Sequence, residues 1–376
     1  MMEGCHAPMR LAIDAMPLLV RSAGVKGYLY HWIAHLRRAG RPAGLEVELF
    51  PWLGEPGELN HESSQVGPLH TWVSLALFHF FNLPGNPALD WVERADIFHC
   101  SRLRNPPRRP RLTATLYDLT CWIMPEFHTP ANVAAERRMA ETVWKRAHGL
   151  IAISSNTRDE AVARLGLDAR RIRVIPCGVD GRFYAVPGAE AARVRAALGL
   201  ERPYVLWVGT IEPRKNLDLA LDAWASLKAS LREEFVLVVA GPQGWAAPAT
   251  VRRLKAQPEG VRYLGYVAEA DLPGLTAGAA ALFYPSLYEG FGLPVAQAMA
   301  CGVAVVTSQG SSLPEVAGEG AVYADPRSVE EVRGALERVL LSEELRGKLG
   351  AAGRARAERY RWEDVARQSL EFFEGV

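Results

Sequence analysis

Two cationic side chains of this chain follow directly after a predicted strand that ends in glycine. The stretch Gly209–Asn216 reads GTIEPRKN and places Arg214 next to Lys215. Such a pair, just before a helix, suits a diphosphate, because the helix dipole and both charges act on the same anion. The alternative is a solvated Arg-Lys pair without a ligand. In both cases we expect a solvated turn, whose side chains contribute little to stability.

A carboxylate occupies a similar position further along the chain. Leu282–Tyr284 is predicted to be a short strand, and the turn that contains Glu289 leads to Pro294, a residue preset for the first position of a helix. A carboxylate repels phosphate but accepts hydrogen bonds from two neighbouring hydroxyls. Glu289 therefore suits the hydroxyl groups of a sugar or a ribose.

These side chains need parallel strands whose carboxyl ends meet at one edge of a sheet. Apolar strand patterns alternate with amphipathic helices in both halves of the chain, which predicts two Rossmann-like α/β domains. The predicted strands begin at residues 10, 47, 96, 112, 149 and 173 in the first half and at residues 204, 235, 261, 282 and 303 in the second. Neither half has a GxGxxG turn after its first strand with an acidic residue about twenty positions later, which argues against a dinucleotide dehydrogenase.

The composition is that of a globular protein with two cores. The chain has 376 residues, of which 49% are hydrophobic, and a formal net charge of +1. A charge so close to zero argues against a nucleic-acid protein whose affinity rests on phosphate neutralisation. The cluster Arg108, Arg109 and Arg111 is interpreted as a solvated loop between prolines, with a ligand role as the alternative.

The cysteines and the N-terminus bear on the cellular compartment. The five cysteines are scattered and are expected to be free thiols in a reducing compartment. The first residues, MMEGCHAPMR, lack the apolar core of a signal peptide. Trp72–Phe81 is about half the ~20 residues that span a bilayer. We expect a cytoplasmic protein in which this stretch is a core helix or, as the alternative, a helix that dips into the inner membrane face.

The residues around Glu289 resemble a known family. Glu289–Gly302 (EGFGLPVAQAMACG) is similar to the signature of the retaining glycosyltransferases of the large family four, the group 1 glycosyltransferases, in which two glutamates stand eight positions apart. Gln297 takes the place of the second glutamate. The GTIEPRKN turn resembles the diphosphate-binding turn of the mannosyltransferase-like branch. The resemblance spans most of the chain and implies the GT-B arrangement, two Rossmann-like domains that face one another across a cleft.

The resemblance also assigns the predicted domains. Residues 1–185 form the N-terminal Rossmann-like domain on the acceptor side, and residues 200–358 form the C-terminal domain that binds the nucleotide-sugar. The Pro/Gly/Ala-rich chain between them is the expected linker. Residues 359–376 resemble the family's crossover helix, which packs back on the N-terminal domain.

Four residues are expected to be catalytic. By the resemblance, Arg214 and Lys215 stabilise the charge that grows on the departing diphosphate, and Glu289 holds the hydroxyls of the transferred sugar. Asp118 follows a strand that ends at Tyr117, where the family usually places His-Asp, and it would orient the sugar or the acceptor. The alternative for Asp118 is a turn or capping residue.

The expected substrate contacts are spread over both domains. Gly24 and Gly27 lie in a predicted glycine loop between a strand and a helix that starts at Tyr28, and in the family this loop faces the donor diphosphate, although GxxG occurs in many turns. The base of the nucleotide is expected near position 266 and the ribose near position 297. The expected substrate-binding residues of the second domain are Gly209, Tyr266, Val267, Phe291, Gly292, Leu293 and Gln297.

The resemblance implies a retaining hexosyltransferase of polysaccharide biosynthesis. It would move a hexose, by preference mannose from GDP-mannose, from a nucleotide diphosphate sugar to a glycan, lipid-linked or small-molecule acceptor. The nucleotide-sugar donor is a co-substrate, so no cofactor is expected. No metal is expected either, because no Asp-x-Asp pair or His cluster stands at a strand end. We expect no nucleic-acid partner, and a peripheral membrane contact is an alternative.

Two other functions stay open. Tyr117 and Gln297 depart from the family pattern, which a GT-B-fold sugar-nucleotide-binding protein with weakened catalysis would explain. An epimerase or hydrolase acting on a sugar nucleotide would form product without an acceptor. The intact Arg214, Lys215 and Glu289 favour the transferase over the binding protein.

Overall fold

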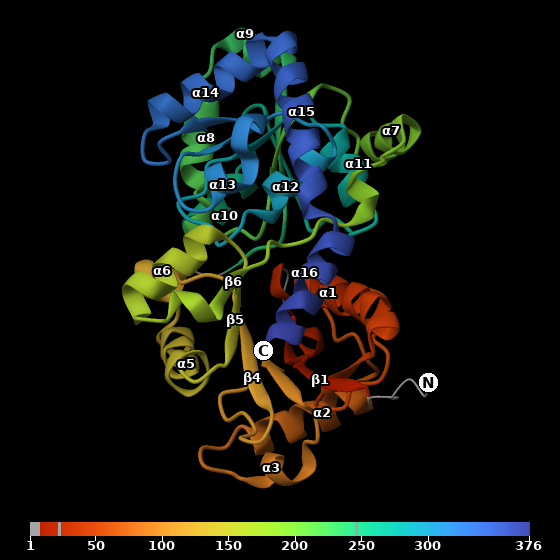
Figure 1. Ribbon diagram of the computed structural model, residues 1–376. Coiled ribbons are helices and arrows are strands. Elements are labelled where there is room, and N and C mark those ends of the chain that lie inside the picture. Colours follow the sequence, from red (N-terminus) through yellow and green to blue (C-terminus); the bar gives the residue numbers. More distant parts are fainter. Residues whose placement is uncertain (1–7, 22–23, 245–246) are drawn as a thin grey trace. The chain divides into compact units, whose positions relative to one another are not determined.

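The computed structural model describes residues 8–21, 24–244 and 247–376. The chain divides into two compact units (Figure 1): Met1–Gly178 together with Trp362–Val376, and Val179–Arg361. Each unit contains one six-stranded sheet, and its strand pairs are all parallel. The predicted α/β class is confirmed.

The sheet of the first unit has the strand order β2-β1-β3-β4-β5-β6. Its strands are β1 (Met9–Asp14), β2 (Leu45–Phe50), β3 (Ile97–Cys100), β4 (Arg111–Leu116), β5 (Gly149–Ala152) and β6 (Ile172–Val174). Its helices are α1 (Gly24–Gly40), α2 (Pro68–Phe81), α3 (Ala88–Val92), α4 (Thr120–Ile123), α5 (Pro130–Met139), α6 (Ser155–Leu165) and α16 (Trp362–Gly375). Because β2 and β3 lie on opposite sides of β1, the sheet has a switch point between β1 and β3, where ligands of open α/β sheets bind.

Helix α16 completes the core of the first unit. The indole of Trp32 in α1 donates a hydrogen bond to the Ser369 hydroxyl at 2.9 Å. The indole of Trp362 covers Gly178 so closely that a Cβ at this glycine would lie 2.1 Å from the ring. The boundary between the units therefore lies after Gly178 rather than at residue 185. The expected linker is structured as well, because α7 (Gly188–Ala197) belongs to the second unit.

The sheet of the second unit has the strand order β12-β11-β10-β7-β8-β9, with its switch point between β10 and β7. Its strands are β7 (Tyr204–Val208), β8 (Val236–Ala240), β9 (Val261–Gly265), β10 (Ala281–Tyr284), β11 (Val305–Ser308) and β12 (Ala321–Ala324). Its further helices are α8 (Leu217–Ala225), α9 (Ala229–Glu234), α10 (Pro248–Lys255), α11 (Leu272–Ala277), α12 (Leu293–Ala300), α13 (Leu313–Ala317), α14 (Val329–Leu341) and α15 (Glu343–Ala357).

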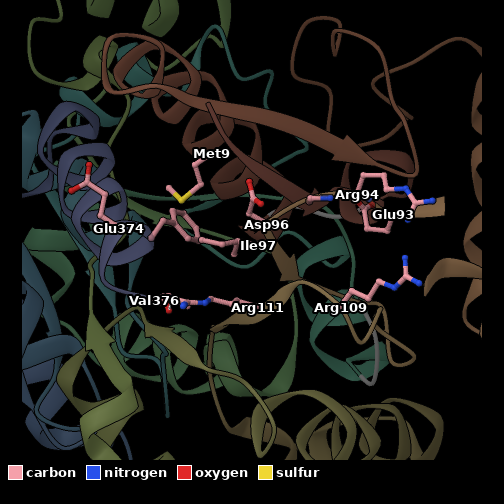
Figure 2. A pocket seen from close by; sticks show the side chains of 11 residues that line it. Met9, Glu93, Arg94, Asp96, Ile97, Arg109, Arg111, Glu374 and Val376 are labelled. Carbon is pink, nitrogen blue, oxygen red and sulfur yellow. Dashed lines mark hydrogen bonds between the residues drawn. The ribbon is translucent and has the colours of Figure 1, made fainter. Parts of the chain in front are cut away.

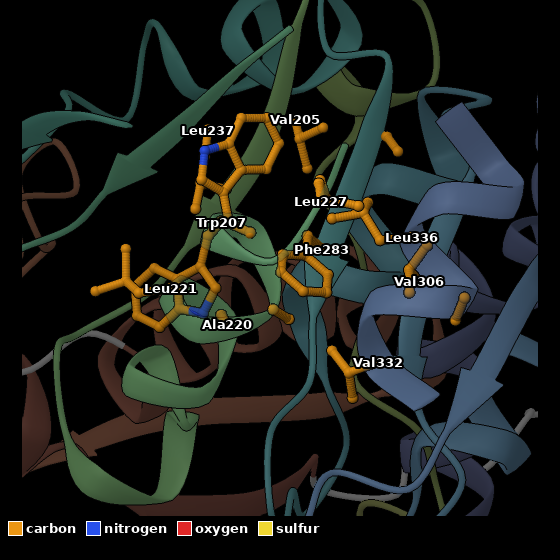
Figure 3. Close-up of a cluster of buried hydrophobic side chains, with 14 of the residues drawn as sticks. Val205, Trp207, Ala220, Leu221, Leu227, Leu237, Phe283, Val306, Val332 and Leu336 are labelled. Carbon is orange, nitrogen blue, oxygen red and sulfur yellow. The ribbon is translucent and has the colours of Figure 1, made fainter. Parts of the chain in front are cut away.

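One large hydrophobic cluster fixes α8 and α14 on the sheet of the second unit. Figure 3 shows Trp207 of β7 and Phe283 of β10 among side chains of both helices, including Leu221 and Leu336. Trp207, Phe283 and Leu336 are completely buried. Burial of each such side chain stabilises the fold by about 1.5–3 kcal/mol. This cluster holds the carboxyl ends of β7 and β10 in place.

The cysteines and the apolar helices were used above to predict the cellular compartment. The four described cysteines, Cys100, Cys121, Cys177 and Cys301, are all free thiols, and Cys5 lies outside the described residues. Among the described residues, no helix is both long and apolar enough to cross a bilayer.

Candidate active site

Two glycine turns meet at the carboxyl edge of the second sheet. Gly209 follows β7 with φ +151°, and Gly241 follows β8 with φ +144°. A Cβ at Gly241 would lie 1.9 Å from the carbonyl oxygen of Gly209, and the amide of Gly209 donates to the carbonyl of Ala240 at 2.9 Å. Only glycine permits this backbone contact. The contact sends the chain after β7 across the edge of the sheet.

The GTIEPRKN turn is tied to the loop that follows β10. Asn216 has a left-handed backbone, with φ +57°, and its side-chain amide donates to the carbonyls of Pro285 and Pro326 at 2.9 and 2.7 Å. The amide of Leu287 donates to the carbonyl of Arg214 at 2.9 Å. Arg214 and Lys215 are therefore held against the loop that carries Glu289.

Glu289 lies at the centre of the resulting cluster. Its Oε1 accepts hydrogen bonds from Lys215 Nζ at 2.7 Å, from the Ser286 hydroxyl at 2.7 Å and from the Tyr284 hydroxyl at 2.9 Å. Its Oε2 lies 2.8 Å from Nη1 of Arg214. Both oxygens are thus occupied by protein groups.

A second carboxylate balances the cluster. Nη2 of Arg214 contacts Oε1 of Glu212 at 2.6 Å, and Lys215 also donates to the hydroxyl of Tyr284. Arg214, Lys215, Glu212 and Glu289 together carry two positive and two negative charges. The cluster is therefore neutral, and its cations are paired inside the protein.

The cluster is buried, which contradicts the expected solvated turn. The side chains of Arg214 and Lys215 are only 14% and 12% exposed. Burial alone would raise the pKa of Glu289, but the charges of Arg214 and Lys215 hold this pKa at about 2. Burial lowers the pKa of Lys215, although the charge of Glu289 opposes that shift. Removal of one member leaves a buried charge without its partner, so we expect these side chains to affect stability as well as chemistry.

The predicted contacts around α12 lie in different surroundings. Gly292 precedes α12 with φ +97°, and a Cβ there would lie 2.6 Å from the Leu313 side chain. Phe291 is buried, and its ring packs edge-on against Tyr360 at 5.3 Å. Gln297, on the second turn of α12, is half-buried, as is Leu293 at its start. Gln297 and Leu293 can therefore reach a ligand more readily than Phe291.

The predicted base contacts follow β9. Tyr266 is 43% exposed, whereas Val267 is buried. An exposed aromatic ring at a strand end can stack on a base.

The predicted residues of the first unit fit their expected positions less well. Oδ1 of Asp118 accepts from the amide and the hydroxyl of Thr120, at 3.0 and 2.6 Å, at the start of α4. These contacts fit the alternative of a turn or capping residue, as a turn, because the N-cap of α4 is Leu119. Gly24 and Gly27 lie in the first turn of α1 itself, so the expected glycine loop before a helix at Tyr28 is wrong.

The two glycines also lack the close contacts that would require glycine. A Cβ at Gly24 would meet nothing within 4 Å, and one at Gly27 would meet only His61, at 3.3 Å. The neighbouring Lys26 is fully buried and donates to the carbonyls of Asn60 and Ser63 at 3.1 and 2.8 Å. In the described residues, the segment around 60–63 therefore packs on the first turn of α1.

Sequence reasoning missed three members of the cluster. Glu212, Tyr284 and Ser286 bind Arg214, Lys215 and Glu289 directly. The sequence contains features that could have identified two of them. Glu212 lies within the GTIEPRKN turn, and Tyr284 is the polar last residue of an apolar strand. The structure thus brings together Arg214, Lys215, Glu289 and Gly209 of the predicted set. Asp118, Gly24 and Gly27 belong to the other unit.

A buried carboxylate also lies at the carboxyl edge of the first sheet. Asp14, the last residue of β1, is completely buried. Its Oδ2 accepts from the amides of Ser101, Arg102 and Leu103 at 3.0, 2.5 and 2.6 Å, and Oδ1 from the amide of Met16 at 3.2 Å. Burial raises the pKa of Asp14, and the four amides only partly oppose this shift.

Comparison with family models matches both units. Residues 189–356 match the model "Glycosyl transferases group 1", and residues 23–182 match the model "Glycosyltransferase Family 4". The chain is 32% identical to O-antigen chain mannosyltransferase B of Escherichia coli over 277 residues, which cover 73% of each chain. It is 29% identical to the serotype-specific mannosyltransferase WbdA of Escherichia coli over 240 residues, but the match spans only 29% of that protein.

Solved structures share the fold over almost the whole chain. Sucrose-phosphate synthase of Thermosynechococcus elongatus matches with a TM-score of 0.71 and 21% identity, over 98% of this chain and 99% of the synthase. HepE of Anabaena, in complex with UDP and glucose, matches with a TM-score of 0.73 and 18% identity, over 98% of this chain and all of HepE. At these identities the similarity supports a shared fold only.

Proposed function

This chain belongs to the group 1 glycosyltransferases, nucleotide-sugar-dependent hexosyltransferases of the GT-B fold, and on that premise we propose that it transfers mannose from GDP-mannose with retention of the anomeric configuration. The acceptor is a glycan, free or lipid-linked, or a small molecule. The observation that carries the proposal is the Arg214–Lys215–Glu289 cluster at the edge of the second sheet. The similarity to O-antigen chain mannosyltransferase B supports mannose as the sugar.

The cations serve the leaving group. When the bond between C1 of the sugar and the diphosphate breaks, negative charge collects on the leaving phosphate, and donors that are already in place lower this barrier most. Arg214 and Lys215 are fixed next to the strand end, but both pair with Glu289 in the unliganded protein. Donor binding therefore gives each cation a second anion, and the neutral cluster takes up the negative charge of the diphosphate.

Glu289 serves as a hydrogen-bond acceptor rather than an acid. A pKa of about 2 keeps its carboxylate ionised at neutral pH, so it cannot deliver a proton. In the donor complex Lys215 and Arg214 turn toward the diphosphate, and the Glu289 oxygens accept from hydroxyls of the transferred sugar in their place. Gln297 contacts the ribose and Tyr266 the base. Val267 and the backbone around Gly292 and Leu293 adjoin the donor.

The transfer itself is an attack on the face that the diphosphate leaves. The acceptor oxygen forms the new bond to C1 as the old C1–O bond breaks, and its proton passes to an oxygen of the departing phosphate. Asp118 orients the acceptor or the sugar through the carboxylate oxygen Oδ2, since Oδ1 accepts from Thr120. Gly24 and Gly27 contribute to donor binding in this proposal because the family resemblance implies it.

The positive charge for the leaving group comes from side chains in this proposal, not from a metal ion. Turnover with the donor is therefore expected to continue in EDTA. Activity that vanishes in EDTA and returns with manganese would show that a metal is required.

The proposal also includes a peripheral contact with a membrane, which a lipid-linked acceptor requires.

Two measurements test the donor and the stereochemistry of the transfer. A thermal-shift panel of GDP-mannose, GDP, UDP-glucose and UDP should show the largest stabilisation with the guanosine ligands. Transfer to a mannose-containing oligosaccharide should then give an α-linked product by NMR. Stabilisation by UDP-glucose alone, or a β-linked product, would overturn the donor or the retaining mechanism.

A further inference from the structure

Helix α2 presents an apolar face to solvent. Its 14 residues, PLHTWVSLALFHFF, contain no Asp, Glu, Lys or Arg, and only Ser74, Phe78 and Phe81 are buried. Beside the exposed His70 and His79, five exposed apolar residues repeat at the spacing of one helical face, and we call them the apolar face of α2: Leu69, Trp72, Val73, Ala76 and Phe80. Trp72 is 69% exposed and Phe80 is 50% exposed. A solvent-facing helix surface of this kind normally carries polar side chains.

The apolar surface continues onto α3. Leu83, just after α2, and Trp91 and Val92 at the end of α3 are 53%, 68% and 48% exposed. Both helices lie at the same end of the first unit (Figure 1). Two exposed tryptophans on adjoining short helices are typical of proteins that enter the interfacial region of a bilayer.

An arginine-rich loop borders this surface. Residues 102–111, which we call the arginine loop, contain five arginines. The amide of Arg104 donates to Asn82 at the end of α2, the side chain of Asn105 donates to the carbonyl of Phe81, and the amide of Arg108 donates to Asp90 of α3. The loop is therefore fastened to both apolar helices.

Exposed guanidinium groups extend from this region. Arg94, two residues after the end of α3, and Arg109 of the arginine loop are both exposed, and they lie on one side of a shared pocket, with Glu374 on the other (Figure 2). The nearby acids are engaged within the protein. Asp90 binds the amide of Arg108, and Glu93 binds the amides of Arg94 and Ala95. Between residues 90 and 111 six arginines outnumber three acids, so the rim of the apolar surface is basic.

We propose that the apolar face of α2, the end of α3 and the arginine loop dock on an anionic lipid surface. Tryptophan, phenylalanine and leucine side chains enter the boundary between head groups and acyl chains, and arginines bind the lipid phosphates. A basic rim favours lipid over a second copy of this chain, because two identical basic rims would repel each other. The inference names the partner surface for the membrane contact in the proposed function and rests on it in that respect.

The test measures binding of the full-length protein to vesicles without donor or acceptor. Vesicles of phosphatidylcholine with a third of phosphatidylglycerol should bind the protein in a flotation assay, and vesicles of phosphatidylcholine alone should bind it far more weakly. The double variant Trp72→Gln/Phe80→Gln should lower the partition coefficient about tenfold or more. Arg109→Glu should lower the partition coefficient about fivefold or more, and high salt should lower it as well.

Matched control variants lie in the second unit. Leu341→Gln changes an apolar side chain that is 62% exposed, and Arg252→Glu reverses an exposed charge on α10. Both controls should bind vesicles as the unchanged protein does. Since all substituted side chains are exposed, the melting temperatures of the variants should stay within a degree or two of the unchanged protein.

Three results would overturn the proposal. They are no vesicle binding by the unchanged protein, equal binding to neutral and anionic vesicles, and unchanged binding in both α2 and Arg109 variants. If the α2 variant instead changes the sedimentation coefficient and not vesicle binding, the face is an interface between copies. Retained transfer to a soluble oligosaccharide in the vesicle-defective variants would separate this result from a failure of the proposed transferase activity.

Discussion

The two sheets each hold a buried carboxylate at the carboxyl edge, but they compensate its charge differently. Glu289 in the second unit is paired with the side-chain cations Arg214 and Lys215. Asp14 in the first unit is held by four backbone amides. The pKa of Glu289 is lowered to about 2, whereas burial raises the pKa of Asp14. The two sheets thus stabilise a buried carboxylate at the carboxyl edge by different electrostatic means, although the two residues follow different strands.

The cations around Glu289 can bind a different anion, whereas the carboxylate of Asp14 holds a backbone loop in place. Side-chain cations can turn from one anion to another, so the cluster around Glu289 can admit a diphosphate. Backbone amides cannot leave Asp14 without unfolding the 101–103 loop. The neighbouring His99 is neutral, because burial lowers its pKa to about 3.

The largest expected effect is a loss of folding stability when the charge of Glu289 is removed. Glu289→Gln leaves Arg214 and Lys215 buried beside a neutral amide, and loss of one partner from a buried ion pair costs about 3–5 kcal/mol. Urea denaturation should show this loss. Glu358→Gln, at an exposed ion pair with Arg361, is the control and should change stability by less than about 1 kcal/mol. Equal effects of the two variants would mean that the cluster around Glu289 is solvated.

Lys215→Ala should damage both chemistry and stability. Loss of a donor at the leaving diphosphate should lower kcat/KM ~10²-fold or more, and the melting temperature should also fall, since Glu289 loses a buried partner. Lys255→Ala, at an exposed lysine of α10, serves as the control for both measurements. Near-normal kcat/KM with a lowered melting temperature would reduce Lys215 to a structural role.

Asp14→Asn tests the carboxylate that backbone amides hold. The amide keeps one acceptor oxygen but turns an N–H₂ group toward backbone donors, so some of the four hydrogen bonds are lost. We expect a loss of about 1–3 kcal/mol in urea denaturation at neutral pH. A loss larger than that of Glu289→Gln would reverse the order of the two sites.

Acid denaturation should show that Glu289 and Asp14 change the pH dependence of stability in opposite directions. The folded pKa of Glu289 lies below its ordinary value of 4.5, so its stabilisation is complete above pH 4.5 and is lost as the pH falls toward 2. The folded pKa of Asp14 lies above its ordinary 3.8, so its contribution is present below that pH and is lost as the pH rises. Between pH 3 and 6, Glu289→Gln should therefore flatten the rise of stability with pH, and Asp14→Asn should steepen it.

The smallest expected effect concerns ligand affinity at the charged edge. Glu in place of Gln297 can accept from both ribose hydroxyls with a charged group, which is worth about 1 kcal/mol, or several-fold in affinity. Gln297→Glu should tighten GDP binding in calorimetry without changing the preferred base. Weaker binding, or a lower melting temperature, would remove Gln297 from the ribose site.

The sequence predicts the strands and the strand ends well, because buried parallel strands are continuous apolar runs that stop at glycine. It therefore placed Gly209, Arg214 and Glu289 at one edge. It could not predict that Lys215 is buried, since that depends on Tyr284 at the end of β10, 69 positions away, and on Glu289 in the loop that follows. Asp14 escaped notice for the same reason, because its partners at 101–103 come from another loop. The helical first turn at Gly24 was missed because glycine weakly favours loops.

The discontinuity of the first unit has a consequence during synthesis on the ribosome. Helix α16, which covers Trp32 and Gly178, is translated only after the whole second unit. The second unit is contiguous in sequence and can reach its native state as soon as Arg361 has left the exit tunnel. The first-made half of the polypeptide must wait with part of its aromatic core uncovered. The order of completion is thus the reverse of the order of translation, and the nascent first half is the natural client of a chaperone.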